Sequence, residues 1–426
     1  MAELEIKAVE NLLGTPVSYA YATKAGPWIF LNGHEAFDFA GGVPEAVAGP
    51  AGFPRWGRPR ARREGDFILA RMRRILRELG SDLESGVRLD QYYPTPKAVD
   101  PYHLARHAAF GDYIPPSTSV VMERCFAAEA TISSSLIAVV PDPQYQIRKI
   151  HPHGVGSAPS SGFVPTVICN EFVFVAGQMA HNPGQGLDPR AHVPEHSVWA
   201  GSEIRKQTEF LILEKLQPAL AAAGSSLERS LKAQVYLANV EDFPDFLEVW
   251  NRHYANIPCA VTVVPTKSFA TVGGIIEINL LALTDDATRE KQVITAEIPG
   301  MAAYGPCIRA GEFLLPSGLM AVGHDGHVAG TALSPGFTGL AHAGCVQAAA
   351  VYDYAEALCR AAGTSLAKTL RAQYFVSDVA QFPGIAMAWA ARFGAQPHPF
   401  VCVQTPDAMP APGLTLIADF WISTPA

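Results

Sequence analysis

A period of about 140 residues recurs along this chain and limits what it can fold into. Three kinds of landmark repeat in a constant order: a glycine turn after an apolar run, a glycine after a long helical stretch, and a glutamine inside a strand-like run. These are Gly33, Gly177 and Gly318; Gly80, Gly224 and Gly363; and Gln91, Gln234 and Gln373. Their intervals fall between 139 and 144 positions. Such a period is too long for a solenoid and predicts three related domains.

Each repeat has the same predicted order of elements, β-β-α-β-α-β-β, which indicates the α+β class. The predicted domains span residues 1–140, 162–284 and 298–426. Residues 141–161 and 285–297 are predicted linkers. The first linker holds four prolines with serine and glycine clusters, so we expect neither helix nor strand there.

The long helix of the second repeat is expected to run from about residue 198 to 223. Two residues that disfavour helix, Gly201 and Pro218, lie inside this span and predict interruptions. The remaining long helices are expected at residues 65–79 and 342–362.

Composition favours repeats that pack on one another. Hydrophobic residues make up 49% of the chain and charged residues only 17%, which leaves more apolar surface than three separate small domains would hide. The net charge is −8, and the longest basic cluster is the short stretch 58–63, so a nucleic-acid partner or a ribonuclease role is disfavoured.

Targeting and redox signals predict a cytoplasmic protein that does not enter the membrane. No apolar run reaches about 18 residues, and the first residues lack the pattern of a signal peptide. The seven cysteines are scattered without a CxxC pair, which is typical of reduced thiols.

Short motifs of the second repeat follow one another in a distinctive order. They are AGQ at 176–178, AAGSSL at 222–227, QVYL at 234–237, DFPDF at 242–246 and IEI at 276–278. This order resembles the YjgF, or Rid (reactive intermediate deaminase), family of imine and enamine deaminases, which also carries the endoribonuclease L-PSP name. The resemblance is strongest in the second repeat and weakest in the first. It implies a chorismate-mutase-like α+β fold, with one chain forming a pseudo-threefold trimer and sites in the clefts between neighbours.

The arginine that pairs with a substrate carboxylate in this family has no match here. The corresponding segments read Pro116-Ser-Thr118, Pro258-Cys-Ala260 and Pro397-His-Pro399, with Phe400 as the candidate if the register slips by one. Because a buried carboxylate without a partner costs several kcal/mol, the usual binding of a 2-imino acid is not expected.

By the same resemblance, three residues are candidates for catalysis: Glu277, Tyr304 and Tyr19. Glu277 matches the family glutamate that orients the attacking water, whereas the other repeats have Ser133 and Ile417 there. Alternation along the strand also allows Glu277 to face solvent without a role.

Seven further residues match positions that line the family's pocket: Thr262, Ser317, Asn32, His103, Phe163, Gly177 and Gly318. The wall opposite Glu277 depends on the direction in which the ring closes. If the third repeat faces Glu277, Tyr304 and Ser317 are its partners. If the first repeat does, they are Tyr19, Asn32 and His103.

Two classes of function remain open. The first is a cofactor-independent hydrolase acting on a small imine or enamine, with Glu277 orienting water, or a chorismatase-like enzyme acting on an enol ether. The second is a small-molecule-binding protein without catalysis. No nucleotide-binding motif is present, and the histidine pairs at 151–153 and 324–327 lack a third ligand at a recognisable spacing, so neither cofactor nor metal is predicted. The partner is a small molecule, and the chain is expected to act as a monomeric pseudo-trimer or a higher homo-oligomer.

Overall fold

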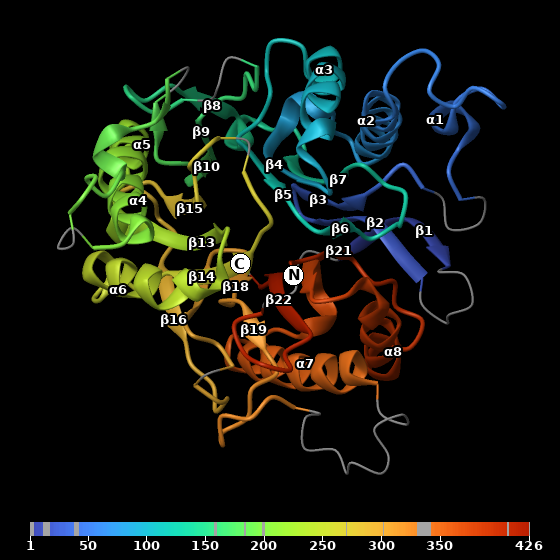
Figure 1. Ribbon diagram of the computed structural model, residues 1–426. Coiled ribbons are helices and arrows are strands. Elements are labelled where there is room, and N and C mark those ends of the chain that lie inside the picture. Colours follow the sequence, from blue (N-terminus) through green and yellow to red (C-terminus); the bar gives the residue numbers. More distant parts are fainter. Residues whose placement is uncertain are drawn as a thin grey trace.

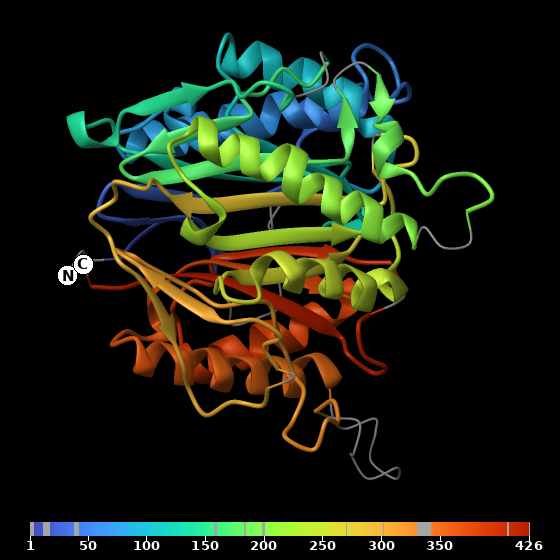
Figure 2. The ribbon, with the colours of Figure 1, turned by 90° about the vertical axis from the view of Figure 1, so that its left-hand side faces the viewer.

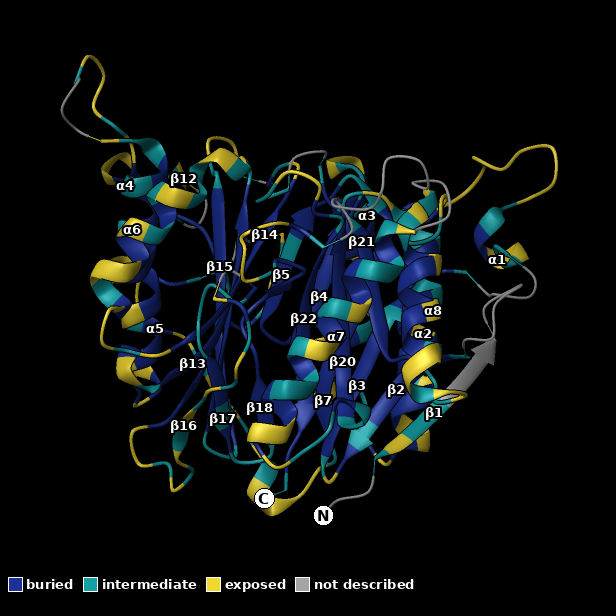
Figure 3. Ribbon diagram, turned by 90° about the horizontal axis from the view of Figure 1, so that it is seen from below, coloured by how far each residue is buried: buried dark blue, intermediate teal, exposed yellow. Residues whose placement is uncertain are grey.

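Three mixed β-sheets lie around a shared centre, and helices cover their outer faces (Figure 1). In the computed structural model the described residues are 4–11, 18–37, 42–156, 160–182, 185–197, 201–269, 271–300, 302–329, 342–406 and 409–425. Seen from the side, the strands form the interior and the helices the outside (Figure 2). Burial follows this arrangement, because the strands are buried along most of their length whereas the helices expose their outer faces (Figure 3). The predicted α+β class is confirmed.

The three sheets share one strand order. The first runs β1 (Glu5–Asn11), β2 (Ser18–Ala25), β3 (Trp28–His34), β7 (Ser133–Val139), β4 (Gly86–Tyr93) and β5 (Ser117–Val121). The second, in the same direction, runs β8 (Ile147–Ile150), β9 (Thr166–Cys169), β10 (Phe172–Gln178), β15 (Ile276–Leu283), β13 (Ser230–Leu237) and β14 (Ala260–Pro265). The third runs β16 (Lys291–Ile294), β17 (Cys307–Ala310), β18 (Phe313–Leu315), β22 (Leu416–Ser423), β20 (Thr369–Val376), β21 (Phe400–Gln404) and β6 (Arg124–Cys125). In addition, β19 (Leu319–Met320) pairs with β22, and β11 (His181–Asn182) pairs with β12 (Gly186–Leu187).

Both predicted linkers contain a strand, so the expectation of neither helix nor strand in the first linker is wrong. Strand β8 lies within residues 141–161 and pairs with β9, and β16 lies within 285–297 and pairs with β17. The prolines and glycines cluster on either side of β8 and leave Ile147–Ile150 free to pair at the edge of the sheet. Strand β6 crosses from the first repeat to the third sheet, where it pairs with β21.

Two helical stretches cover each sheet. They are α2 (Arg60–Glu78) and α3 (Val99–Phe110) on the first, α4 (Glu203–Leu211), α5 (Gln217–Ala222) and α6 (Phe243–Tyr254) on the second, and α7 (Ala343–Ala361) and α8 (Phe382–Phe393) on the third. A single turn, α1 (Glu45–Ala48), precedes α2. Within the described residues no helix is both long and apolar enough to span a lipid bilayer.

The long helix of the second repeat differs from its prediction at both expected interruptions. Gly201 has a positive φ of 82° and lies before the helix, which begins at Glu203. Pro218 does not break the helix, because a π turn at Ile212–Leu216 precedes it and α5 then starts with Pro218 in its first turn. A proline lacks the N–H that would bond four residues back, and the first turn of a helix tolerates that loss.

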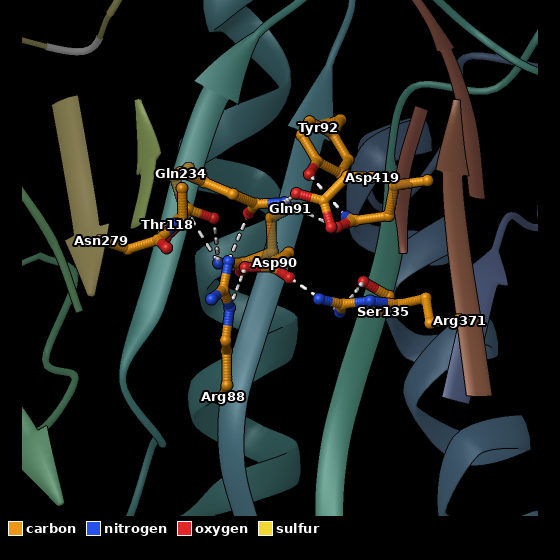
Figure 4. A network of polar contacts seen from close by, with 12 residues as sticks. Arg88, Asp90, Gln91, Tyr92, Thr118, Ser135, Gln234, Asn279, Arg371 and Asp419 are labelled. Carbon is orange, nitrogen blue, oxygen red and sulfur yellow. Dashed lines mark hydrogen bonds and ion pairs between the residues drawn. The ribbon is translucent and has the colours of Figure 1, made fainter. Parts of the chain in front are cut away.

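A buried polar network joins the central strands of the three sheets (Figure 4). Each central strand supplies one basic residue: Arg88 on β4, Lys232 on β13 and Arg371 on β20. Asp90 pairs with Arg88 at 2.9 Å and with Arg371 at 2.9 Å, and Asp419 on β22 pairs with Lys232 at 3.2 Å. These ion pairs therefore connect sheet one to sheet three and sheet three to sheet two.

Two glutamines complete this network. The Gln234 amide donates to Gln373 Oε1 at 2.7 Å and to Asp419 Oδ2 at 3.1 Å, and it accepts a hydrogen bond from Arg88. Strand pairing places Asp90 opposite Ser135, in the position that Gln234 and Gln373 hold in their own sheets. The landmark Gln91 is therefore displaced by one residue from the other two glutamines.

An aromatic cluster adds a second contact among the three sheets. Trp28 of sheet one lies 5.5 Å from Phe172 of sheet two and 5.2 Å from Phe313 of sheet three, measured between ring centroids. Phe313 in turn lies 5.4 Å from Trp421. Edge-to-face pairs of this kind add about 0.5–1.5 kcal/mol each beyond the burial of their area.

We predict that Arg371→Met destabilises the whole chain. The substitution leaves Asp90 with one cation in place of two, and breaking a buried pair costs about 3–5 kcal/mol. Urea unfolding followed by circular dichroism measures the change. Arg74→Met on α2 is the control, because its side chain is 66% exposed and we expect a change within about 0.5 kcal/mol. Equal urea midpoints for the two variants would contradict the role of the network.

Candidate functional site

The three sheets meet at three junctions of the same construction. At each junction the turn glycine of one sheet lies against a strand of its neighbour. A Cβ added to Gly177 would lie 3.1 Å from Thr118 Oγ1, and one added to Gly318 would lie 3.1 Å from Thr262 Cγ2. A Cβ added to Gly33 would lie 3.2 Å from Val401 Cα. We name these the one/two, two/three and three/one junctions after the sheets that form them.

The last strand of each sheet brings a different residue to its junction. Ser133, Glu277 and Ile417 occupy equivalent positions, because they pair with Tyr92, Tyr236 and Phe375 in the same register. Only the one/two junction therefore has a carboxyl group at this position.

Glu277 is buried in the one/two junction, with 5% of its surface exposed. Its carboxyl group lies directly over Gly177, where an added Cβ would come within 1.9 Å of Oε1. Burial, opposed by a hydrogen bond from the Ser119 backbone N–H, raises the pKa of Glu277 to about 8. The reading of Glu277 as a solvent-facing strand residue is wrong.

The wall opposite Glu277 comes from the first sheet. Thr118 on β5 faces Gly177, and its hydroxyl accepts a hydrogen bond of 3.0 Å from Asn279, which lies two residues beyond Glu277 on β15 (Figure 4). The first repeat thus faces Glu277 through β5. Of the three partners expected for that case, Tyr19 and Asn32 do not lie opposite Glu277, and His103 lies on α3.

The three candidate catalytic residues lie at three different junctions, so the expectation that Glu277 shares a site with Tyr304 or Tyr19 is wrong. Tyr304 lies at the two/three junction, where its hydroxyl accepts a hydrogen bond of 2.7 Å from the Val263 N–H. Tyr19 lies at the three/one junction, where its hydroxyl donates to the Gly33 carbonyl at 2.5 Å. The physical reason is the direction in which the ring closes, which the order of motifs along one chain does not specify.

The two/three junction contains four predicted residues: Tyr304, Ser317, Gly318 and Thr262. The Ser317 hydroxyl accepts from the Val261 N–H at 2.9 Å, and the Gly318 N–H donates to the Val261 carbonyl at 2.9 Å. These bonds attach β14 of sheet two to sheet three. A cavity of about 830 Å³, including its opening, lies beside Tyr304, Tyr254 and Pro258.

Two predicted residues, His103 and Phe163, lie near the outer part of the one/two interface. Phe163 forms an isolated β-bridge with Ile114 of the first repeat. His103 lies on α3, where burial and the nearby Arg106 lower its pKa to about 3. His103 is therefore neutral at physiological pH.

The three/one junction contains two functional candidates that the sequence interpretation missed, Glu35 and Arg71. Both line a cavity together with the predicted residue Tyr19. Asn32 lies in the neighbouring strand, where its amide donates to the Ala20 carbonyl at 3.0 Å. One sequence signal was present: Glu35 follows its turn glycine by two positions, where the other repeats have Met179 and Met320.

No group of three or more histidine, cysteine, aspartate or glutamate side chains in the described part of the chain has the geometry to hold a metal ion. The histidine pairs at 151–153 and 324–327 lie within that part.

Comparisons with known proteins each match part of this chain, and the family match falls on most of the second sheet and its helices. The family described as Endoribonuclease L-PSP matches residues 155–284. A RutC family protein of Saccharolobus solfataricus is 30% identical over 113 residues, which cover 26% of this chain and 79% of that protein. The mitochondrial protein mmf2 of Schizosaccharomyces pombe is 36% identical over 81 residues, covering 18% of this chain and 64% of mmf2. The crystal structure of yeast Mmf1 is 21% identical, covers 33% of this chain and all of its own, and has a TM-score of 0.28.

We predict that Glu277→Gln changes how stability depends on pH. The pKa of Glu277 is about 8 in the folded state against 4.5 in its ordinary environment, so unfolding releases a proton between these values. This carboxyl group therefore lowers the free energy of unfolding as the pH rises from about 4.5 to 8, by about 3–5 kcal/mol at most. Glutamine carries no such penalty.

Urea unfolding at pH 5 and pH 9 measures the difference. The stability of Glu277→Gln relative to the parent protein should be higher at pH 9 than at pH 5. Glu129→Gln, with a side chain 72% exposed, should follow the parent at both values. If the stability of Glu277→Gln differs from that of the parent by the same amount at both pH values, the raised pKa of Glu277 is contradicted.

Proposed function

The chain belongs to the Endoribonuclease L-PSP family, also called YjgF or Rid, and on that premise we propose that it is a cofactor-independent hydrolase of a small imine or enamine. The family match supports a general deaminase or small-molecule-binding role. The observation that carries the finer proposal is the Glu277 carboxyl group, buried over Gly177 with a pKa near neutrality.

We propose that the chain consists of three fused copies of one domain, with boundaries near 1–140, 162–284 and 298–426. The shared strand order of the three sheets supports this division, although β8 and β16 assign part of each linker to the domain that follows. Three equivalent junctions also support it, because a single chain then supplies every wall that a ring of separate subunits would supply. Seven unpaired cysteines among the described residues agree with a reducing compartment such as the cytoplasm.

In the proposed reaction, Glu277 transfers protons during the addition of water to a C=N bond. The protonated carboxyl group gives its proton to the imine nitrogen, and the resulting carboxylate accepts a proton from the water that attacks the carbon. Collapse of this adduct breaks the C–N bond and releases a carbonyl compound and an amine or ammonia. A carboxyl group with a pKa of about 8 suits both directions of transfer at neutral pH. The Ser119 N–H, which donates to Glu277, and the Thr118 hydroxyl, which accepts from Asn279, hold the carboxyl group and its neighbouring strand in place.

A second candidate is a non-catalytic binding protein or an enol-ether hydrolase of the chorismatase type. The absence of an arginine from segments 116–118, 258–260 and 397–400 favours the non-catalytic binding protein, because a 2-imino acid lacks its usual carboxylate partner at these junctions. A substrate of the one/two junction would then be uncharged.

Turnover of short-lived imines tests the proposal. Imines without a carboxylate, formed in situ from an amine and an aldehyde, are mixed with the protein, and release of the aldehyde is followed by absorbance. We expect Glu277→Gln to lower kcat by about 10²–10⁴-fold, the usual contribution of a general acid or base.

Glu129→Gln is the matched control and should retain full turnover, because Glu129 lies at the surface of the first repeat. Equal turnover by Glu277→Gln and the parent protein excludes the role of Glu277. No turnover of imines or enol ethers by the parent supports the binding protein.

A further inference from the structure

The segment between α1 and α2 carries two exposed aromatic side chains. Residues 50–59 are all exposed, and they follow α1 on the outer surface of the first repeat (Figure 3). Phe53 is 72% exposed and Trp56 is 76% exposed. Every other phenylalanine, tyrosine or tryptophan in the described part of the chain is buried or half-buried. Large apolar side chains that gather on a surface mark sites of interaction.

Arg63 holds this segment in one conformation. Its guanidinium donates to five backbone carbonyls, those of Val47, Ala48, Pro54, Trp56 and Arg58. The Trp56 N–H donates to the Phe53 carbonyl at 2.9 Å and closes a turn between the two aromatic residues. Gly49 has a φ of 89°, and an added Cβ would come within 2.8 Å of the Pro54 carbonyl oxygen. Because the turn is ordered before any partner arrives, binding costs less conformational entropy.

The same segment is basic although the protein is acidic. Residues 53–63 contain five arginines and no acidic residue, whereas the net charge of the chain is −8. Arg58 and Arg62 share one carboxylate, that of Asp66, at 3.0 and 3.1 Å. Arg55 has no ion-pair partner among the residues that the structure describes. The positive charge is therefore only partly neutralised, and it attracts an anionic partner.

A groove with apolar side chains lies next to this turn. It is lined by Pro59, Pro101 and Leu104 together with the two arginines that share Asp66, and it encloses about 580 Å³ including its open side. Leu104 is 63% exposed although it lies near the middle of α3. Helices α2 and α3 lie on the outside of the ring, so the groove is open to a macromolecule (Figure 1). It has room for apolar side chains of a peptide.

The groove and the charge together select among the possible occupants. A flat lipid surface does not enter a groove, and a nucleic-acid backbone has no apolar side chain to fill one. A twofold contact with a second copy of this chain would bring the arginines of both copies together, and like charges repel. An acidic polypeptide segment with apolar side chains supplies both the negative charge and the filling of the groove.

We propose that Phe53, Trp56 and the neighbouring groove form a docking site for an acidic segment of a partner protein that also carries apolar side chains. The partner's apolar side chains lie against the two aromatic rings and Leu104, and its carboxylates pair with Arg55 and Arg58. Aromatic and arginine side chains are the types that contribute most at protein interfaces. The docking site lies on the outer surface of the first repeat and does not depend on the reaction proposed for Glu277.

Fluorescence anisotropy with short labelled peptides tests the docking site on the full chain. The probe is a peptide in which leucines are separated by pairs of glutamates. One comparison peptide has lysine in place of each glutamate, and another has glycine in place of each leucine. We expect saturable binding of the probe and at least about 10-fold weaker binding of both comparison peptides. Added salt should weaken binding of the probe, because the arginines are exposed.

Two variants locate the binding on this surface. Trp56→Ser and Arg55→Glu should each weaken binding of the probe by about 10-fold or more, as expected for a central aromatic side chain and for a reversed charge. Both residues are exposed, so neither variant should unfold the chain. Met387→Ser is the matched control, because Met387 is an exposed apolar residue on α8 of the third repeat, and it should bind the probe as the parent does.

Three further outcomes would overturn the proposal. The first is no saturable binding of the probe, or equal affinity for the glutamate and lysine peptides. The second is binding to vesicles of phosphatidylcholine and phosphatidylserine, or to an oligothymidylate, that Trp56→Ser abolishes while binding of the probe persists. The third is self-association of the parent protein in sedimentation equilibrium that Trp56→Ser abolishes, because this result assigns the surface to a second copy of the chain.

Discussion

The ion pairs at the centre of the molecule determine how the three sheets can be arranged. Arg88, Lys232 and Arg371 come from three strands far apart in the sequence. Asp90 pairs with Arg88 in its own strand and with Arg371 of sheet three, and Asp419 of sheet three pairs with Lys232 of sheet two. Lys232, Arg371 and Asp419 are costly to bury alone, and each has its ionic partner only when the neighbouring sheet is in place. The network therefore favours one register between neighbouring sheets and one direction of ring closure. That arrangement determines which residues meet at each junction.

The ring is symmetric in its strands but not in its chemistry. The same backbone position holds Ser133, Glu277 and Ile417, so only one junction has a carboxyl group at this position of the last strand. The three/one junction instead gains Glu35 from the loop after its turn glycine and Arg71 from the helix above. A chain that contains all three walls can vary each junction separately, whereas identical subunits would repeat every substitution three times.

Much of the fold could be predicted from the sequence, because local signals encode it. Glycines after apolar runs and the period of about 140 residues were sufficient to predict the α+β class and the positions of most helices and strands. Strand β8 was not predicted, because a strand of four residues between prolines is too short to show a periodic pattern. Its stability comes from pairing with β9. The one-residue offset of Gln91 was not predicted, because Asp90 occupies the place that Gln234 and Gln373 hold, and only the strand pairing shows this register.

The site was less predictable than the fold, for a physical reason. Burial of Glu277 follows from packing of β5 against β10, a contact between residues more than 50 positions apart. The prediction that Glu277 shares a site with Tyr19 or Tyr304 was wrong. The assembled ring determines which two sheets meet at each junction, and the sequence of one chain does not specify it. Arg71 was not predicted as a site residue, because its helix contains several arginines. Only the structure distinguishes the buried Arg71 from its exposed neighbours Arg74 and Arg77.

The central claim is that the polar network joins three sheets into one cooperative unit. Native-state hydrogen exchange of the backbone amides in β4, β13 and β20 tests it most directly, because these strands supply the three basic residues. The account predicts that the slowest amides of all three strands exchange with the same opening free energy, since no sheet can separate without leaving buried charges unpaired. Exchange of one strand at a free energy several kcal/mol below the other two would show that its sheet opens independently, and would contradict the account.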